Sequence, residues 1–276
     1  MPMPWTSTHP HPHPSYPHPT PATLRPASRP DLPAIATVGA LAFRDTPLYV
    51  HFAPRHLERS GEDFRAALLL DARMRFESAG QCVVVAELAG DKNEDGGDGK
   101  GGGSEGKGKH KKKKMEVVGY AYWVRVGGRS SGKGRGKKGE WWYREDTWGK
   151  KLRRLLIRAE AIYSGILGPG RIFDAERVRR FHALTKEILR NNANAIGREY
   201  WSLNTLAVLP AFQKRGIGSQ LLEWGLDSIA RKEGVPVTVK STESGFRLYV
   251  RKGFKEVGAV QVTESLRVPV MVFEPS

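Results

Sequence analysis

The fold is decided by the stretch Leu206-Ala207-Val208-Leu209-Pro210-Ala211-Phe212-Gln213-Lys214-Arg215-Gly216-Ile217-Gly218-Ser219. An apolar strand pattern ends at Val208, a turn follows, and a Gly-containing loop leads into a patterned helix. The first amides of a helix have no partner within it, and the aligned peptide dipoles make that end electropositive. Glycines let the backbone approach an anion closely. We therefore predict a socket for a diphosphate in this loop, with Lys214 and Arg215 adding positive charge.

The spacing of these glycines excludes two common nucleotide sites. A dinucleotide fingerprint needs a third glycine and an acidic residue about 20 residues further on, and both are missing. A P-loop ends in Gly-Lys-Ser or Gly-Lys-Thr, which this loop lacks. On glycine spacing alone, the loop could also be only a turn before a helix.

A second segment makes the interpretation more specific. It reads Ser241-Thr242-Glu243-Ser244-Gly245-Phe246-Arg247-Leu248-Tyr249-Val250-Arg251-Lys252-Gly253-Phe254. This helix ending in Leu-Tyr-x-x-x-Gly-Phe, together with the upstream Gln-x-x-Gly-x-Gly loop, resembles the two main motifs of the GCN5-related N-acetyltransferase (GNAT) superfamily. The motifs stand in the expected order and at the expected separation. The resemblance covers about residues 200–260, and residues 31–88 and 116–126 are compatible with it more weakly.

The resemblance implies acetyl-CoA as the cosubstrate. The pantetheine would lie between the strand ending at Val208 and a strand at 235–240, and an amine would attack the thioester directly. The residues implied in binding acetyl-CoA are Leu206, Ala207, Val208, Gln213, Lys214, Arg215, Gly216, Ile217, Gly218 and Ser219. Tyr249 would be the general acid that protonates the leaving thiolate, because a neutral phenol carries a proton at neutral pH. Tyr249 could instead be a core aromatic on a short amphipathic helix.

The general base is not fixed by the resemblance. Relatives often carry a Glu or His on the strand that leads to the loop, where this chain has Ser202 and Asn204. Asn204 could hold a water that relays the proton of the amine, and it is our second candidate catalytic residue. Glu199 and Glu87 could also serve, although each is more typical of a surface acid. A partly deprotonated amine would need no strong base.

Hydrophobic periodicity predicts an α/β protein, and the resemblance implies the acyl-CoA N-acyltransferase (GNAT) fold. We expect a mixed, mostly antiparallel sheet of six to seven strands with flanking helices. Helices are predicted at 31–43, 62–79, 218–233 and 245–252, with two more in 145–196, and strands at 81–88, 116–126, 201–208, 235–240, 255–260 and 266–273. One N-acetyltransferase domain would span 31–276, after a disordered Pro/His-rich tail at 1–30.

Three segments are predicted to interrupt this domain. Low-complexity insertions at 90–114 and 127–139 contain too little apolar surface to fold, and a helical insertion lies at 145–196. The first inserted helix has one apolar face and one basic face, which predicts packing on a core rather than on a membrane. The apolar face comprises Leu152, Leu155, Leu156, Ala159, Ile162, Tyr163 and Ile166. We expect the insertion to shape the acceptor side. Trp141, Trp142, Tyr143 and Trp148 could line an aromatic acceptor site or pack in the core.

Charge and cysteine content limit the other classes of function. The net charge is +16, and residues 92–138 supply about half of it, with 14 Lys and Arg against 5 Asp and Glu. The lysine run 111–114 could be an import or nucleic-acid signal, or a solvated loop. Cys82 is the single cysteine, which excludes an intrachain disulfide and a cysteine metal cluster. We predict no metal, no membrane span and no secretion signal, and hence an intracellular, cytoplasmic or nuclear protein.

Two alternatives to an N-acetyltransferase stay open. A catalytically weak acyl-CoA-binding module would keep the socket without turnover, and the missing base motivates it. A basic nucleic-acid-binding protein would use the lysine tracts, with binding that depends steeply on salt. The predicted partners are acetyl-CoA and an unidentified amine acceptor. The oligomeric state is not predicted.

Overall fold

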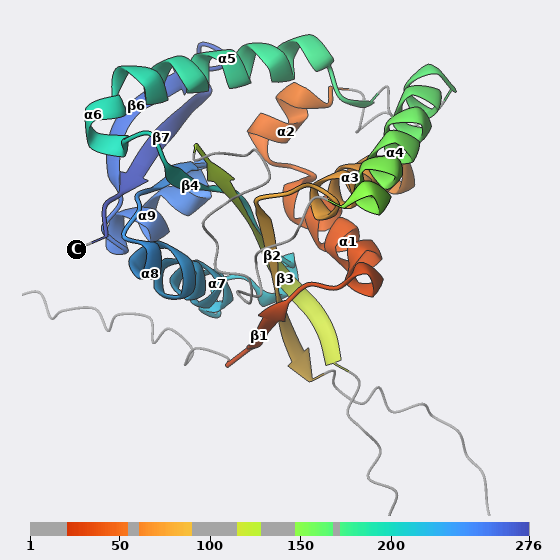
Figure 1. Ribbon diagram of the computed structural model, residues 1–276, viewed down its shortest axis with the longest axis horizontal. Coiled ribbons are helices and arrows are strands. Elements are labelled where there is room, and N and C mark those ends of the chain that lie inside the picture. Colours follow the sequence, from red (N-terminus) through yellow and green to blue (C-terminus); the bar gives the residue numbers. More distant parts are fainter. Residues whose placement is uncertain (1–20, 55–60, 90–114, 128–146, 168–171, 276) are drawn as a thin grey trace, which may run out of the picture.

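A computed structural model describes residues 21–54, 61–89, 115–127, 147–167 and 172–275 (Figure 1). These residues form a seven-stranded sheet in the order β1-β2-β3-β4-β5-β7-β6. All neighbouring strands are antiparallel except β4 and β5, which are parallel. The predicted mixed, mostly antiparallel sheet is therefore confirmed. The strands are β1 Thr23–Pro26, β2 Gln81–Ala89, β3 Met115–Val126, β4 Tyr200–Val208, β5 Val237–Lys240, β6 Lys255–Gln261 and β7 Arg267–Phe273.

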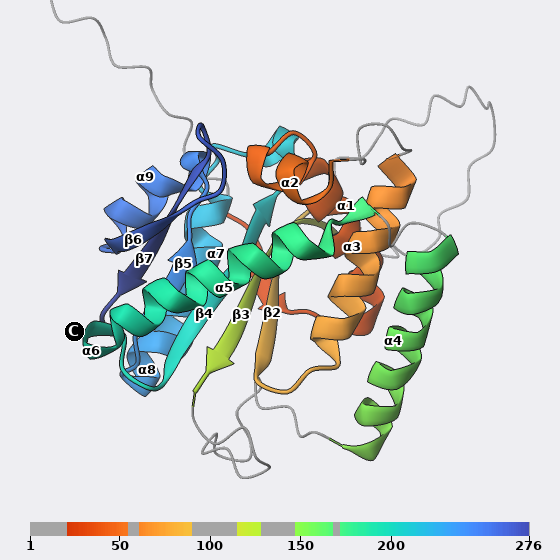
Figure 2. The ribbon, with the colours of Figure 1, turned by 90° about the horizontal axis from the view of Figure 1, so that it is seen from above.

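Helices cover both faces of the sheet (Figures 1 and 2). One face carries α7 to α9, and the other carries α1 and α3 at the β2–β3 side and α5 across the β6–β7 side. The helices are α1 Leu32–Phe43, α2 Pro47–Phe52, α3 Gly61–Phe76, α4 Trp148–Leu167, α5 Ala175–Asn191, α6 Ala193–Ile196, α7 Ile217–Gly225, α8 Arg231–Glu233 and α9 Glu243–Arg251. A π-helical turn at Leu226–Ala230 joins α7 to α8.

The two faces bury separate hydrophobic clusters because alternate residues of a strand point to opposite sides. On β2, Cys82 and Val84 pack in the cluster that includes α7 and α9, whereas Val83 and Val85 pack beneath α1 and α3. A third cluster joins α2 and α5 to β6 and β7. Asp174 caps α5, since its side chain accepts hydrogen bonds from the amides of Glu176 and Arg177.

The predicted disordered tail at 1–30 includes residues that are part of the fold. Thr23–Pro26 form β1, which pairs with β2, and the Arg25 guanidinium bridges Asp31 and Glu87 at 2.7 and 2.5 Å. The short helix α2 was also not predicted. The remaining tail residues 1–20 lie outside the described residues, as do the insertion at 90–114 and residues 128–139 of the second insertion.

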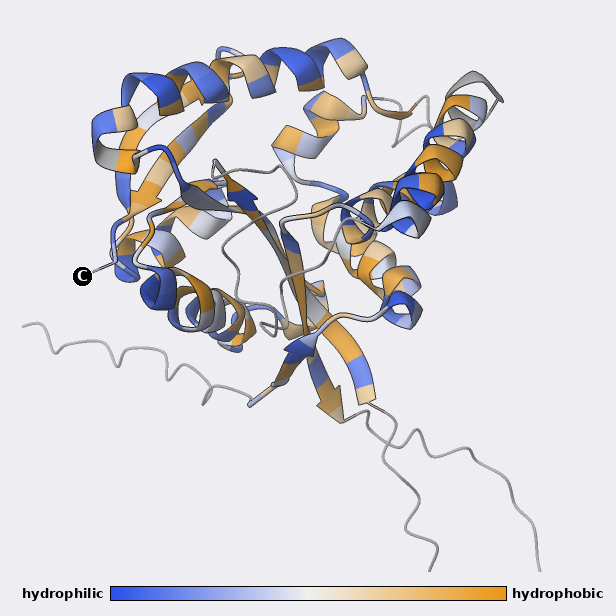
Figure 3. Cartoon of the chain, viewed as in Figure 1, coloured by the Kyte–Doolittle hydropathy of each residue, from blue (hydrophilic) through white to orange (hydrophobic). Residues whose placement is uncertain are grey.

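The expectation that the apolar face of α4 packs on a core is wrong. Its large apolar side chains are mostly exposed, and Figure 3 shows apolar residues along this helix. Exposed fractions are 59% for Leu152, 58% for Leu155, 61% for Leu156, 65% for Ile162 and 67% for Tyr163. The helix instead rests on α3 through buried Ile157, a hydrogen bond from Arg154 to the Glu77 carbonyl and an Arg73–Glu160 ion pair.

The aromatic residues predicted next to this helix do not form a core either, as far as they are described. Trp148 is 84% exposed, and the Lys151 ammonium lies 4.8 Å from its ring centroid. Trp141, Trp142 and Tyr143 lie outside the described residues. Trp148 therefore contributes nothing to the sheet core.

Candidate functional site

A wedge opens between β4 and β5, the two parallel strands. Their ladder contains only the pairs Trp201–Val237, Ser202–Thr238 and Leu203–Val239. Beyond Leu203, β4 continues along β3 to Val208, whereas Lys240 of β5 pairs with Val270 of β7. Residues 204–208 therefore have no strand partner on the β5 side among the described residues. The strand edge there is open to hydrogen bonding by a ligand.

A β-bulge at Asn204 starts this separation. On β3, Trp123 lies opposite Leu203 and Tyr122 lies opposite Thr205, so Asn204 is an extra residue between them. A bulge bends its strand and leaves the extra residue outside the ladder. The bend and the end of the β4–β5 ladder coincide at this residue.

The loop after β4 carries a row of free backbone amides. The Gln213 side chain donates to the Val208 carbonyl at 3.0 Å and closes the turn. Gln220 donates its amide to the Gly216 carbonyl at 3.0 Å. Between them, no described residue accepts a hydrogen bond from the amides of residues 214–219. These amides are available to an anion at the start of α7.

Two residues of this loop have a left-handed backbone. Lys214 has φ 60° and Gly216 has φ 80°, so the chain is left-handed at both residues. Only glycine adopts this conformation without steric cost, which explains Gly216. Gly218 is different, because a Cβ built there would meet nothing closer than 3.9 Å. Packing does not require a glycine at 218, and its bare backbone keeps the amide row accessible.

Positive charge lies beside these amides. The Arg215 guanidinium lies 5.3 Å from the centroid of the Phe212 ring, and both Lys214 and Arg215 are exposed. The structure thus brings together the ten residues predicted to bind acetyl-CoA, from the open edge of β4 through the loop to the first turn of α7.

Tyr249 of α9 lies on the α7–α9 side of the wedge. Its side chain is 6% exposed and belongs to the same cluster as Leu203 and Val239. The ring packs edge-on against Phe254, with 5.5 Å between centroids. Burial raises the pKa of the Tyr249 phenol well above its ordinary 10. The phenol therefore keeps its proton at neutral pH, as a general acid must.

A polar cluster lies on the opposite side of the wedge. The Asn204 Oδ1 atom accepts hydrogen bonds from Ser202 Oγ and Lys240 Nζ, both at 3.0 Å. Burial, and then the charge of Arg75, lower the pKa of Lys240 from its ordinary 10.5 to about 8. Burial and the charge of Lys240 also lower the pKa of His182 on α5. The cluster therefore holds a lysine that is partly neutral near pH 8.

Sequence reasoning missed Lys240 and proposed two acids that the structure places elsewhere. Glu199 pairs with Arg125 at 2.8 Å, at the start of β4 and away from the bulge. Glu87 is not a surface acid, because it is buried in its ion pair with Arg25 on the β1–β2 edge. A charged residue ending the apolar strand 235–239 was the available signal for Lys240.

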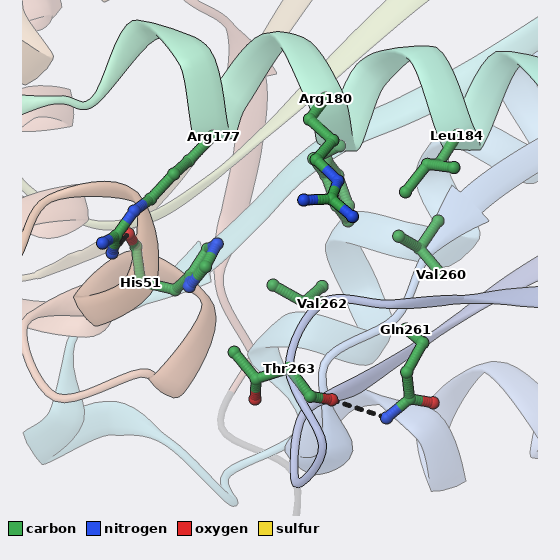
Figure 4. A pocket seen from close by; sticks show the side chains of 9 residues that line it. His51, Arg177, Arg180, Leu184, Val260, Gln261, Val262 and Thr263 are labelled. Carbon is green, nitrogen blue, oxygen red and sulfur yellow. Dashed lines mark hydrogen bonds between the residues drawn. The ribbon is translucent and has the colours of Figure 1, made fainter.

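A cavity of about 370 Å³ lies on the same side of the sheet as Lys240 (Figure 4). It is formed by α2, α5 and the β6–β7 hairpin. Its lining residues are His51, Arg177, Arg180, Phe181, Leu184, Val260, Gln261, Val262 and Thr263. Arginine and apolar side chains therefore share one pocket.

Metal-ligand clusters and membrane-crossing helices are both missing from the described residues. Within them, no group of three or more His, Cys, Asp and Glu side chains is placed to hold a metal ion, and Cys82 is buried on β2. None of the described helices combines the length and the apolar character that a membrane crossing requires.

Comparisons with known proteins agree with this geometry. Residues 181–275 match the family model described as an acetyltransferase (GNAT) domain. A segment of 82 residues is 39% identical to a protein of Ajellomyces capsulatus named probable acyltransferase SID5, and covers 27% of this chain and 60% of that protein.

A solved structure has the same fold. It is the crystal structure of "histone acetyltransferase HPA2 and related acetyltransferase" from Corynebacterium glutamicum, with a TM-score of 0.50 and 20% identity. The alignment covers 93% of this chain and 98% of the bacterial chain. At this identity, the likeness concerns the fold alone.

Proposed function

We propose that this chain belongs to the GCN5-related N-acetyltransferase superfamily and transfers an acetyl group from acetyl-CoA to an amine. The single observation that carries the proposal is the wedge between β4 and β5, with its row of free amides at residues 214–219. Acyl-CoA is the donor that the family uses. The choice of acetyl and the identity of the residues below are our proposals.

The open edge of β4 at Leu206, Ala207 and Val208 would bind the pantetheine through backbone hydrogen bonds. The amides of residues 214–219 would hold the diphosphate, with Lys214 and Arg215 adding charge. This assignment fits the donor set, because a row of amides at a helix start favours an anion. Bound acetyl-CoA supplies an activated thioester carbonyl between the two faces of the wedge.

The two faces would handle the two protons of the reaction separately. The amine nitrogen attacks the thioester carbonyl carbon, so that a C–N bond forms and the C–S bond breaks. On one face, Tyr249 would donate its phenolic proton to the leaving thiolate. On the other, Lys240 would accept the proton released by the amine. A base with a pKa of about 8 suits proton transfer near neutral pH.

Asn204 would position Lys240 in this mechanism. Its Oδ1 atom already accepts hydrogen bonds from Ser202 and Lys240. These contacts favour a role in fixing the lysine side chain over the water relay predicted from the sequence.

A free-thiol release assay tests the proposed function. Purified protein with acetyl-CoA and a panel of amines, polyamines and peptides should release coenzyme A only when an amine is present. If no amine causes release of coenzyme A although acetyl-CoA binds in titration calorimetry, the result favours the acyl-CoA-binding module instead. The absence of both binding and release would contradict the proposal and the module alike.

A further inference from the structure

The arginine-lined cavity lies next to the polar cluster of the wedge. Lys240 pairs with Val270, and Val268, two residues along β7, pairs with Val260 in the cavity wall. Strand rise and strand spacing put Val260, two strands away, roughly 12 Å from Lys240 along the sheet. An acceptor whose amine lies near Lys240 could therefore reach the cavity with its other end.

The cavity combines an apolar wall with cationic side chains. Leu184 of α5 faces Val260 of the β6–β7 hairpin (Figure 4). Phe181 and Val262 also line this wall. No acidic residue lines the cavity among those described. Such a lining suits a ligand that has an apolar body and an anionic group.

The two arginines of this cavity differ in how far their charge is neutralised. Arg177 Nε lies 3.3 Å from Asp174 Oδ2, and its Nη1 donates to the His51 carbonyl at 3.0 Å. No described residue pairs with Arg180, whose guanidinium points from α5 towards Val262 in Figure 4. Arg180 is therefore the cation left for a ligand.

The histidine in this cavity adds little charge at neutral pH. Burial and the positive charge of Arg177 lower the pKa of His51, against the opposing effect of Asp174. The positive potential of the cavity therefore depends on arginine, whose charge does not titrate in the physiological range.

We infer that this cavity binds the anionic end of the acceptor, so that the acceptor is an amine joined by an apolar spacer to a carboxylate or similar anion. The inference rests on the proposed function, and Arg180 determines the specificity. A guanidinium holds a carboxylate by two charge-assisted hydrogen bonds, which an uncharged amide cannot reproduce.

The test is titration calorimetry of the full chain saturated with coenzyme A, the product thiol, so that no transfer occurs. The probes are ω-amino acids from 4-aminobutanoate to 8-aminooctanoate, each compared with its own primary amide. The best carboxylate should bind at least about tenfold more tightly than its amide. Arg180→Gln should remove most of this preference.

The matched control variant changes Arg179, the residue next to Arg180 on α5. Arg179 is exposed, and its Nε donates to the Ala175 carbonyl; it does not line the cavity. Arg179→Gln makes the same charge change and should keep the preference. Equal binding of acids and amides by the parent chain, or equal effects of the two variants, would overturn the inference.

Thiol release measured in parallel separates this inference from the proposed function. Release with amines regardless of their carboxylate would retain the transferase and reject the anion site. An Arg180-dependent preference without release by any amine would retain the anion site and reject the transferase.

Discussion

Lys240 Nζ lies 3.0 Å from Asn204 Oδ1, in a hydrogen bond that joins β5 to β4 one residue beyond the last pair of their ladder. Val239, the preceding residue, packs with Tyr249, and successive side chains of a strand point to opposite faces. The lysine and the tyrosine therefore lie on opposite faces of the wedge. This separation is what a reaction needs when it releases a proton from an amine and delivers another to a thiolate.

Replacing Lys240 should remove the rise of activity with pH. Because a base must be unprotonated, kcat/KM of the parent should rise through a pKa of about 8. The groups facing Lys240 are Arg75 and His182, together with neutral Asn204. Lys240→Met should lose this inflection and most of the activity. The measurement is a pH–rate profile with an acceptor amine whose own pKa lies well below neutral.

The control for this profile is Lys255→Met, which removes an exposed lysine on β6. It should leave the profile unchanged. If the inflection near pH 8 persists in Lys240→Met, it belongs to another group, and Lys240 is not the base.

Lys240→Met should also stabilise the fold at neutral pH. The lysine titrates at about 8 when folded and at 10.5 when unfolded, so its protonated form opposes folding below pH 8. The pKa shift corresponds to a gain of about 3 kcal/mol in the unfolding free energy of Lys240→Met. The loss of the hydrogen bond to Asn204 reduces this gain by about 1 kcal/mol. The gain in unfolding free energy should shrink between pH 8 and 10.5, as seen in urea titrations. A loss of stability at pH 7 would contradict the predicted burial cost.

Tyr249→Phe should reduce turnover without weakening the binding of acetyl-CoA. The change removes one oxygen from a ring that packs on Phe254, so the core stays filled. Loss of a general acid costs about 100-fold or more in rate. Thiol-release rates and calorimetric affinity, measured on the same samples, check this. Unchanged turnover would return Tyr249 to the role of a core aromatic.

Gly218→Val should weaken the binding of acetyl-CoA and leave the fold intact. A Cβ at this position makes only ordinary contacts with Leu248 and Val208 at 3.9 Å, whereas a branched side chain would cover the amide row. The affinity for acetyl-CoA should fall about tenfold, the value of a hydrogen bond to a charged group. The melting temperature, measured without ligand, is the control. Unchanged affinity would mean that no ligand approaches this backbone.

Much of the fold could be predicted because its signals are local. The β-branched run of β2 and the glycines at 216 and 234 mark elements through their own conformational preferences. β1 could not be predicted, because this strand of four residues at the sheet edge depends on the Arg25–Glu87 ion pair across 62 positions. Local propensity contains no information about such a contact.

The candidate site also has one part that the sequence predicts and one part that it does not. The amide row is local, so the loop motif predicted which residues the structure brings together. The role of Lys240 depends on its burial and on the charge of Arg75 from α3, which only tertiary packing brings about. The exposed apolar face of α4 shows the converse, since a helical pattern identifies an apolar stripe without identifying what covers it.

The most direct test of the central claim is an amide ¹H–¹⁵N correlation spectrum recorded while acetyl-CoA is added. We predict that the amide resonances of residues 214–219 shift together and gain protection from exchange. They should do so at the concentration that saturates binding. Saturable binding that leaves these six amides unshifted would contradict the account.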